Sequence, residues 1–439
     1  DRTYEKLQVL GLTEEDKDWR TQAADLGLAL LVVVVLVLFT ARVFPSLIDH
    51  PRQQMLLVSV LAIIAIGARL LIPGHVLMPF IFPCAAAAML VTLFVDVRVG
   101  SLVAVVSALI VASVAGGSME LLVYTLVGCA VGALCMMGTE QLSTFFVATG
   151  LLALANVGIL LLYGVRGNDY DTLGLLQLAG AGTLNALLST ALAFVAYAFT
   201  GRVFGITTSL QLMELARPTH PLFRQLLIKA PGTYHHSILI ANMAESAAEA
   251  IGADALLTRV GAYYHDVGKT LRPYFFAENQ ADGQNPHKKL DPRTSAEIII
   301  GHTTEGLGLA RRYHLPAKVT AFIPEHHGTT LAAYFYRQAV EASRDGEELD
   351  EGAFRYPGPK PQSRETAIVM LADAVEAWSR ANRPTTQAEM ERLIRQVIND
   401  RLISGELDET DLTLKDLDRI RQAFASILAG EYHPRVQYP

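Results

Sequence analysis

Histidine and aspartate side chains recur between residues 236 and 373 in an order that could build a metal site. The clearest stretch is GAYYHDVGKT (residues 261–270), in which His265 and Asp266 are adjacent. Because such a pair also arises by chance in a chain with 12 histidines, it indicates a metal site only if other ligands can reach it. The candidate ligands are His236, His265, Asp266, His302, His326, His327 and Asp373.

The spacing of these residues assigns them to separate helices. Successive ligands or ligand pairs are 29, 37, 24 and 46 residues apart, so each helix would supply one or two. Antiparallel packing could bring all of them to one cavity. Five histidines and two aspartates, with one aspartate shared, offer eight metal bonds, which suits two divalent ions with open positions. A single histidine on an apolar face is ordinarily a core residue, but seven ligands in this order favour a dinuclear site.

The local sequence supports two of these assignments. Asp373 lies within the apolar run IVMLADAVEAW, where a buried carboxylate needs a cation or a hydrogen-bond donor. Pro324 and Gly328 flank the His326–His327 pair and would distort or end the helix there, so that both rings can face one cavity. Two ions roughly 3.5 to 4 Å apart could activate water for attack on phosphorus and stabilise the leaving oxygen. The residues therefore predict a metallophosphoesterase.

Two further side chains are candidate substrate contacts. Lys269 follows His265 by four residues and could hold a phosphate oxygen beside the ions, so Asp266 and Lys269 are the predicted catalytic residues. Tyr356, in the loop RYPGPKP, could stack on a base, although a Pro/Gly loop serves equally well as a rigid connector.

Three other histidines are weaker candidates. His235 directly precedes His236 and could replace it as a ligand. His220 and His287 lie in loops at or near prolines, and we expect neither of them to bind metal.

Composition divides the chain into an apolar half and a mixed polar half. Long apolar runs with few charges fill residues 25–200. All three cysteines fall in this half, so a metal in the polar half must be held by histidine and carboxylate. The net charge of −7 is mild and no Lys/Arg-rich tract stands out, which argues against a nucleic-acid polymer as partner.

The apolar half predicts seven membrane spans surrounded by lipid. A span needs about 20 apolar residues. The predicted segments are 25–44, 54–72, 76–95, 99–115, 119–137, 143–165 and 173–200. The positive-inside rule places the C-terminal half in the cytoplasm and the N-terminus outside. Because the chain starts at Asp1 without a basic region, we expect an upstream domain to be missing and residues 1–22 to be an extracellular stub.

Polar residues inside the apolar half indicate packing rather than transport. Asn156 and Asn185 lie near the centres of their spans, and we expect them to form hydrogen bonds between helices. Charged side chains, which would mark an ion or proton pathway, are scarce in the spans.

The polar half shows helical periodicity and almost no strand alternation, so the whole chain is predicted to be all-α. We predict a connector helix within residues 203–230. Further predicted helix boundaries are a start near Thr233, a stop at Gly252 and N-caps at Asp254, Asp291 and Ser363. Residues 385–431 are charged and helical, and we expect them to form a solvated bundle flanking the site.

These residues resemble those of the HD-domain metal-dependent phosphohydrolases. That family's order of His, then His-Asp, then a distant Asp is matched by His236, His265–Asp266 and Asp373. More closely, the chain resembles the seven-transmembrane-receptor HD phosphodiesterases of bacteria. The matching stretches are ELARPTHPLFRQLLIKAPGTYHHS, YHDVGK, NPHKKLDPRTSAEIIIGH, PEHHGT and FRYPGPKPQSRETAIVMLADAVEA.

The resemblance implies a domain layout and an activity. A seven-span bundle (23–202) and a connector (203–230) would precede a cytoplasmic all-helical HD domain (231–439) in a bacterial plasma membrane. It implies that His236 rather than His235 is the first ligand, and that a second ion, commonly iron or manganese, is bound. The implied reaction is hydrolysis of cyclic di-AMP to linear pApA, regulated through the transmembrane or extracellular part. Whether the protein forms a homodimer stays open.

Two other functions are consistent with parts of the sequence. The HD-GYP class cleaves cyclic di-GMP with similar ligands, but its Gly-Tyr-Pro signature is missing, because His327 is followed by GTTLAAYFY. A receptor whose HD module only binds a nucleotide would be expected to have lost ligands, and none is missing.

Overall fold

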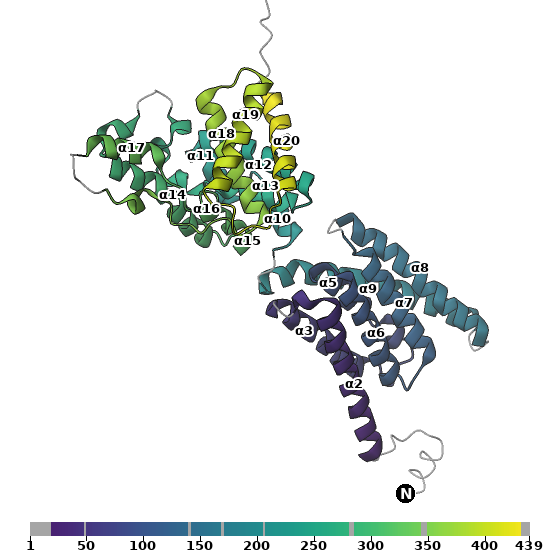
Figure 1. Cartoon of the computed structure of the whole chain (residues 1–439). Coiled ribbons are helices and arrows are strands. Elements are labelled where there is room, and N and C mark those ends of the chain that lie inside the picture. Colours follow the sequence, from purple (N-terminus) through teal and green to yellow (C-terminus); the bar gives the residue numbers. More distant parts are fainter. Residues whose placement is uncertain are drawn as a thin grey trace, which may run out of the picture. The chain divides into compact units, whose positions relative to one another are not determined.

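The computed structural model describes residues 19–47, 50–138, 142–167, 171–204, 207–280, 285–343 and 349–431. Nearly all of this described part is helical, and its extended pairing is an isolated bridge between Leu331 and Arg355. The chain forms two compact units, Asp1–Phe204 and Gly205–Pro439 (Figure 1). The all-α prediction is confirmed. The predicted boundaries after residues 22, 202 and 230 stay predictions, and predicted stub residues 1–18 lie outside the described residues.

The first unit consists of apolar helices that follow the predicted segments. Its helices are α2 (Trp19–Val43), α3 (Pro51–Leu71), α4 (Met78–Ile81), α5 (Ala85–Phe94), α6 (Val97–Val114), α7 (Met119–Cys135), α8 (Leu142–Gly167) and α9 (Thr172–Phe204). The third predicted segment is split into α4 and α5, because Pro83 has no N–H with which to continue the helix. The Asp96 side chain caps α6 by accepting a hydrogen bond from the Arg98 N–H, at the short turn between α5 and α6.

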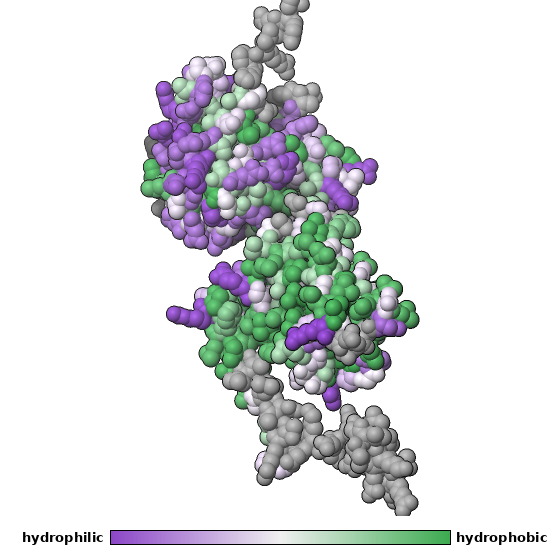
Figure 2. Space-filling view, turned by 90° about the vertical axis from the view of Figure 1, so that its right-hand side faces the viewer, coloured by the Kyte–Doolittle hydropathy of each residue, from purple (hydrophilic) through white to green (hydrophobic). Residues whose placement is uncertain are grey.

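Within the residues whose side chains the structure describes, four helical segments are long and apolar enough to cross a membrane. They are Pro51–Leu71, Val97–Val114, Ser143–Arg166 and Thr172–Phe199. Val33–Val43, Met78–Phe94 and Met119–Cys135 are shorter apolar stretches. The face drawn in Figure 2 is predominantly hydrophobic on the first unit and predominantly hydrophilic on the second. The first unit is therefore a membrane unit, while the count of seven spans stays a prediction.

The predicted hydrogen bonds between membrane helices are present. The Asn185 side-chain amide donates to the carbonyls of Phe80 (3.1 Å) and Phe82 (2.8 Å) at the break between α4 and α5. Asn156 donates to the Gly182 carbonyl and to the Asn185 side chain, both at 3.2 Å. The two Asn185 bonds satisfy main-chain carbonyls that the break leaves without helical partners, which an apolar environment requires.

The second unit is built from α10 to α20 around a main apolar core, with a smaller apolar cluster around Phe335 and Phe354. Its helices are α10 (Ser209–Leu215), α11 (Pro221–Lys229), α12 (Pro231–Ile251), α13 (Ala255–Tyr264), α14 (Pro292–Arg312), α15 (Ala317–Thr320), α16 (Phe322–Glu325), α17 (Ala333–Ala342), α18 (Arg364–Asn382), α19 (Gln387–Ile403) and α20 (Leu414–Glu431). The 3₁₀ turns are η2 (Val267–Leu271), η3 (Pro273–Phe275), η4 (Ala277–Asn279), η5 (Pro286–Lys289) and η6 (Glu351–Phe354). Leu212 and Phe223 are buried in this core, so α10 and α11 pack as part of it.

Local capping signals set the ends of the site helices. Gly252 ends α12 in the left-handed conformation at φ 69°. Asp254, Asp291 and Ser363 each accept a hydrogen bond from the N3 N–H of α13, α14 and α18. These predicted caps are confirmed, and α12 begins at Pro231, two residues before the predicted start.

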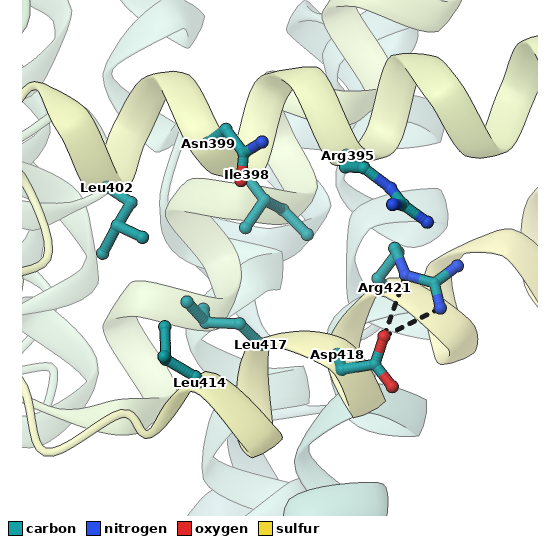
Figure 3. Close-up of a pocket in the computed structure, with 8 residues that line it drawn as sticks. All are labelled: Arg395, Ile398, Asn399, Leu402, Leu414, Leu417, Asp418 and Arg421. Carbon is teal, nitrogen blue, oxygen red and sulfur yellow. Dashed lines mark hydrogen bonds and ion pairs between the residues drawn. The ribbon is translucent and has the colours of Figure 1, made fainter.

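The expectation of a solvated flanking bundle at residues 385–431 is wrong. Ile394 on α19 and Ile420, Phe424 and Leu428 on α20 are fully buried, and α20 packs along α12. Their apolar side chains complete the core that backs the site helices. A surface hollow of about 320 Å³ remains between α19 and α20, where Arg421 pairs with Asp418 (Figure 3). None of the predicted metal ligands lines this hollow.

Candidate metal centre

All seven predicted ligands converge within the second unit. His236 lies on α12 and Asp373 on α18. His265 directly follows α13 as its C-cap, and Asp266 directly precedes the turn η2 as its N-cap. The other three are His302 on α14, His326 at the end of α16, and His327 directly after it. The short α16 ends soon after Pro324, which lets the His326–His327 pair turn into the site as predicted.

One group of ligands, here the His236 cluster, consists of His236, His265 and Asp373. Its candidate ligand atoms lie within 4.8 Å of one another. His236 Nε2 is 3.1 Å from Asp373 Oδ1. Two imidazoles and one carboxylate match the donors that borderline divalent ions accept.

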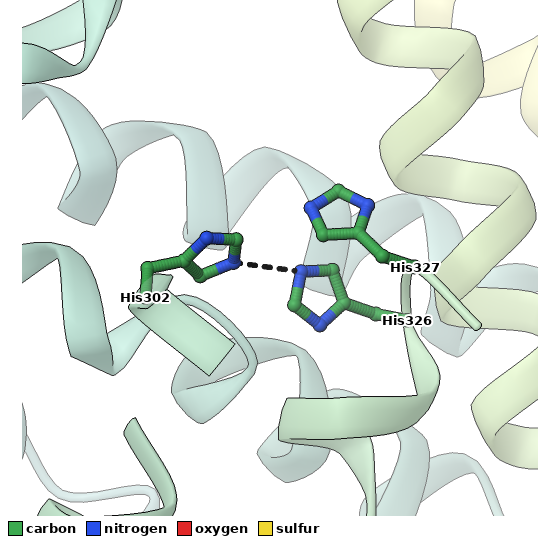
Figure 4. A group of neighbouring side chains, drawn as sticks. All are labelled: His302, His326 and His327. Carbon is green, nitrogen blue, oxygen red and sulfur yellow. Dashed lines mark hydrogen bonds between the residues drawn. The ribbon is translucent and has the colours of Figure 1, made fainter. Parts of the chain in front are cut away.

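The other group, the His302 cluster, consists of His302, His326 and His327, also with ligand atoms within 4.8 Å. His302 Nε2 lies 3.3 Å from His326 Nε2, and the three rings converge from α14 and the end of α16 (Figure 4). The His327 ring centroid is 4.0 Å from that of His326, and His327 Nδ1 is 3.8 Å from Asp373 Oδ2.

Asp266 lies between the two clusters, with one carboxylate oxygen toward each. Its Oδ2 is 3.2 Å from His265 Nε2 and 3.5 Å from His236 Nε2. Its Oδ1 is 3.3 Å from His302 Nε2 and 3.7 Å from His326 Nε2. This placement fits a carboxylate shared by two ions.

Main-chain carbonyls orient three of the imidazoles. The Nδ1 atoms of His265, His302 and His326 lie 2.7, 2.6 and 3.0 Å from the carbonyl oxygens of Ala262, Ile299 and Phe322. A proton on each Nδ1 donates to that oxygen, so each Nε2 keeps its lone pair toward Asp266. Their helices therefore fix the tautomer that a metal requires.

The residues present fit a bound cation. Asp266 is 1% and His265 0% exposed, and neither the Asp266 oxygens nor His265 Nε2 form a hydrogen bond of good geometry, although Asp266 Oδ2 has an ion-pair contact with Lys269 Nζ at 2.7 Å. Buried polar atoms are normally satisfied, so atoms left this way in a converging set indicate an ion. These residues could hold two divalent ions, one at each cluster, with Asp266 between them.

The pKa shifts of the side chains in the site are consistent with a bound cation. Burial alone would raise the pKa of the Asp266 carboxyl, but His265 and Lys269 hold it well below its usual range. Burial, together with the neighbouring His265, lowers the pKa of His326 to about 3. Burial also opposes charge on His236, yet its contacts with Asp373 and Glu376 raise its pKa to about 10. A carboxylate must be ionised and an imidazole neutral to bind a metal ion. The acidic residues around His236 favour a positive charge at that position.

Gly268 allows α14 to approach the His-Asp turn. A Cβ at this position would lie 1.8 Å from the His302 carbonyl oxygen. A larger residue would therefore push α14 away from η2 and separate His302 from Asp266. The close approach explains why glycine follows the His-Asp pair so soon.

The two predicted substrate contacts lie beside the ligands. Lys269 Nζ is 2.7 Å from Asp266 Oδ2 and 3.0 Å from Glu278 Oε1. Tyr356 is buried, and its ring lies against His327 with centroids 4.2 Å apart and an interplanar angle of 31°. Both side chains border the site, and their contact with substrate stays a prediction.

The structure separates the other histidines from the site. His235 is exposed on α12 and its ring contacts Tyr234. His220 bonds the Tyr264 hydroxyl at 2.9 Å, and His287 Nε2 lies 3.0 Å from the Phe275 carbonyl. None of the three belongs to either cluster, in agreement with the preference for His236.

Sequence reasoning missed two acidic residues around the ligands. Glu376 Oε2 lies 3.0 Å from His236 Nδ1, and Glu278 accepts from Lys269 and from the Thr233 hydroxyl. Glu376 follows Asp373 by three residues on α18 and shares its helix face, but this spacing alone does not distinguish it from a glutamate that faces solvent. Glu278 lies in a polar loop where no periodicity marks it.

Comparison with known families agrees with the fold and the site. Residues 19–208 match the family described as "7TM receptor with intracellular HD hydrolase", and residues 233–378 match the HD domain. The apolar helical unit corresponds to the 7TM part of the first description, and the helical unit with the His/Asp centre corresponds to the HD domain. The chain belongs to the family of 7TM receptors with an intracellular HD hydrolase.

Two relatives match along almost the whole chain. "Cyclic-di-AMP phosphodiesterase PgpH" of Bacillus subtilis is 35% identical, with 99% of this chain and 62% of the relative covered. The protein of the same name in Listeria monocytogenes is 33% identical, with 100% and 61% covered. The chain thus spans about three fifths of the length of these relatives. A crystal structure of the L. monocytogenes PgpH HD domain with cyclic-di-AMP is 45% identical and covers 49% of this chain and 100% of that chain, with a TM-score of 0.47.

Proposed function

We propose that this protein is a membrane-bound, metal-dependent phosphodiesterase that hydrolyses cyclic di-AMP to linear pApA. The observation that carries the proposal is the position of Asp266, with one oxygen toward each of two ligand clusters. The names of the two PgpH relatives, which match along almost the whole chain, support the choice of cyclic di-AMP. The HD domain supports a divalent cofactor, and we propose iron or manganese, the metals that the resemblance to the seven-transmembrane-receptor HD phosphodiesterases implies.

Each site residue has a role in this proposal. Two divalent ions would supply Lewis acidity to the phosphoryl group and activate water for the displacement. Asp266 and the six other ligands bind and space the ions. Lys269 places a positive charge 2.7 Å from Asp266 Oδ2, at the edge where a phosphate oxygen would enter. Tyr356 supports the His327 ring and offers an aromatic surface for an adenine base.

The membrane unit anchors this activity. We propose that it has seven spans in a bacterial plasma membrane, with the catalytic unit on the cytoplasmic side, as the positive-inside rule favours. Signals would reach the catalytic unit through the transmembrane or extracellular part.

The test is incubation of the purified full chain with Mn²⁺ or Fe²⁺ against a panel of cyclic dinucleotides, with products separated by chromatography. We expect pApA from cyclic di-AMP and much less product from cyclic di-GMP. His236→Ala should abolish turnover, whereas His235→Ala, which changes the exposed neighbouring histidine, should retain it. Binding of cyclic di-AMP without cleavage by the metal-loaded protein would favour a receptor and overturn the proposal.

A further inference from the structure

We infer that Glu376 is a positioning residue that orients His236 and makes the His236 cluster the tighter of two unequal metal positions. The inference rests on the proposed dinuclear centre. It concerns a carboxylate that is not itself among the seven ligands.

The two nitrogens of His236 face different carboxylates. Its Nε2 lies toward the centre, 3.1 Å from Asp373 Oδ1 and 3.5 Å from Asp266 Oδ2. Its Nδ1 points the other way and lies 3.0 Å from Glu376 Oε2. In the structure this 3.0 Å contact is an ion pair and not a hydrogen bond of good geometry. With a metal bound, a proton on Nδ1 shared with Glu376 would leave the Nε2 lone pair for the ion, which is the arrangement of a carboxylate–histidine–metal triad.

This support differs in kind from that of His265, His302 and His326. Their Nδ1 atoms face neutral main-chain carbonyls. A carboxylate is a charged and stronger acceptor, so it gives the histidine more basic character as a ligand. Because Glu376 is only 7% exposed, little water screens this interaction. The ion held by His236 therefore receives stronger donation than the ion held by the His302 cluster.

Arg380 holds Glu376 in place on α18. Its Nη2 donates to Glu376 Oε2 at 3.0 Å, one helical turn away. Asp373, Glu376 and Arg380 stand at positions i, i+3 and i+7 and so share the face of α18 that meets α12. One helix thus supplies both a ligand and the group that orients a ligand on its neighbour.

Removal of Glu376 should weaken one ion selectively. Loss of a carboxylate that orients a metal-binding histidine typically lowers metal affinity by about 10- to 100-fold. We expect a decrease of this size at one of the two positions in Glu376→Ala. Glu376→Gln should lose less metal affinity than Glu376→Ala, because the amide oxygen can still accept a hydrogen bond from Nδ1. It should still lose some affinity, because the amide carries no charge.

The experiment is Mn²⁺ titration of the apo full chain, read by elemental analysis after equilibrium with a chelator and by electron paramagnetic resonance. The wild type should hold two ions with the signal of a coupled pair. Both Glu376 variants should give an uncoupled single-ion signal at chelator concentrations where the wild type stays coupled. Glu365→Gln is the matched control, because Glu365 on the same helix bonds the Asp254 N–H, away from the site.

Retention of both ions with unchanged affinity in Glu376→Ala and Glu376→Gln would overturn the inference. Thermal unfolding of the apo proteins distinguishes a folding defect from a loss of metal affinity. The isosteric Glu376→Gln should have the same unfolding temperature as Glu365→Gln. The hydrolysis assay is independent: a wild type that binds two ions without cleaving any cyclic dinucleotide contradicts the proposed function but not the role of Glu376. If the wild type cleaves cyclic di-AMP but its metal affinities do not depend on Glu376, the proposed function stands and the inference about Glu376 fails.

Discussion

Asp266 is the residue on which the two ligand clusters depend most directly. Asp266→Ala removes both of its oxygens and with them the carboxylate between the clusters. Since the lost stabilisation of the transition state by the ions is several kcal/mol, we expect kcat/KM for cyclic di-AMP to fall about 10³-fold or more. His265→Ala should act in the same direction.

Both variants should stay folded and membrane-inserted, because neither side chain contributes apolar packing to the core. Chromatographic assays give the rate, and circular dichroism of the purified proteins controls for folding. Turnover within a few-fold of wild type in either variant would remove that residue from the mechanism.

At the residue scale, the convergence of the candidate ligands was predictable from the sequence, whereas the groups that support them were not. His302, His326 and Asp373 could be found because metal chemistry restricts the residue types and because each lies on its own helix. Glu376 could not be identified in this way, since a glutamate on a helix ordinarily faces solvent. Only the packing of α18 against α12 directs its carboxylate to His236.

At the element scale, helix ends were predictable wherever a local signal sets them. Asp254, Asp291 and Ser363 act through bonds to residues three positions away, so the sequence alone contains the information. Burial of α19 and α20 depends instead on contacts with α12 far along the chain, and the many charges of these helices hid their apolar faces. Pro83 causes the break between α4 and α5 locally, but the carbonyls there are satisfied by Asn185, about a hundred residues later.

The turn between α19 and α20 supports the loop that follows the paired histidines. Glu406 is 2% exposed, and its carboxylate accepts from the Thr329 N–H at 3.0 Å and from the Thr329 hydroxyl at 2.7 Å. Gly328 leaves the space for it, because a Cβ there would lie 2.2 Å from Glu406 Oε2. The C-terminal helices therefore position the segment that carries His326 and His327.

Glu406→Ala should destabilise the second unit and loosen the His302 cluster. Hydrogen bonds to a charged group contribute about 1.5 to 3 kcal/mol, and we expect a loss of this size in the free energy of unfolding. Metal content after chelator competition should fall as well. Asp411→Ala is the control, because Asp411 is exposed in the same segment between α19 and α20. Equal stability and metal content in the two variants would show that Thr329 is held without Glu406.

At the scale of the whole molecule, the two units have different stabilising forces. The membrane unit exposes large apolar side chains such as Leu154 and Leu162, which lipid would cover. The second unit has its own buried core and additionally encloses Asp266 and Asp373 among histidines. Composition predicted this division correctly. It did not predict that the third apolar segment would be interrupted to give the short helices α4 and α5.

Metal removal should therefore destabilise one unit and not the other. An ion that binds only the folded state contributes about 2.7 kcal/mol at 100 times its dissociation constant. For a unit of roughly 200 residues, each kcal/mol corresponds to about 2 to 4 °C, so a chelator should lower its unfolding temperature by roughly 5 to 10 °C. Scanning calorimetry of the full chain in detergent should show one transition that shifts and one that does not. Asp266→Ala, which lacks the shared carboxylate, should show a much smaller chelator effect. A chelator that shifts both transitions equally, or shifts Asp266→Ala as much as wild type, would place the bound metal elsewhere.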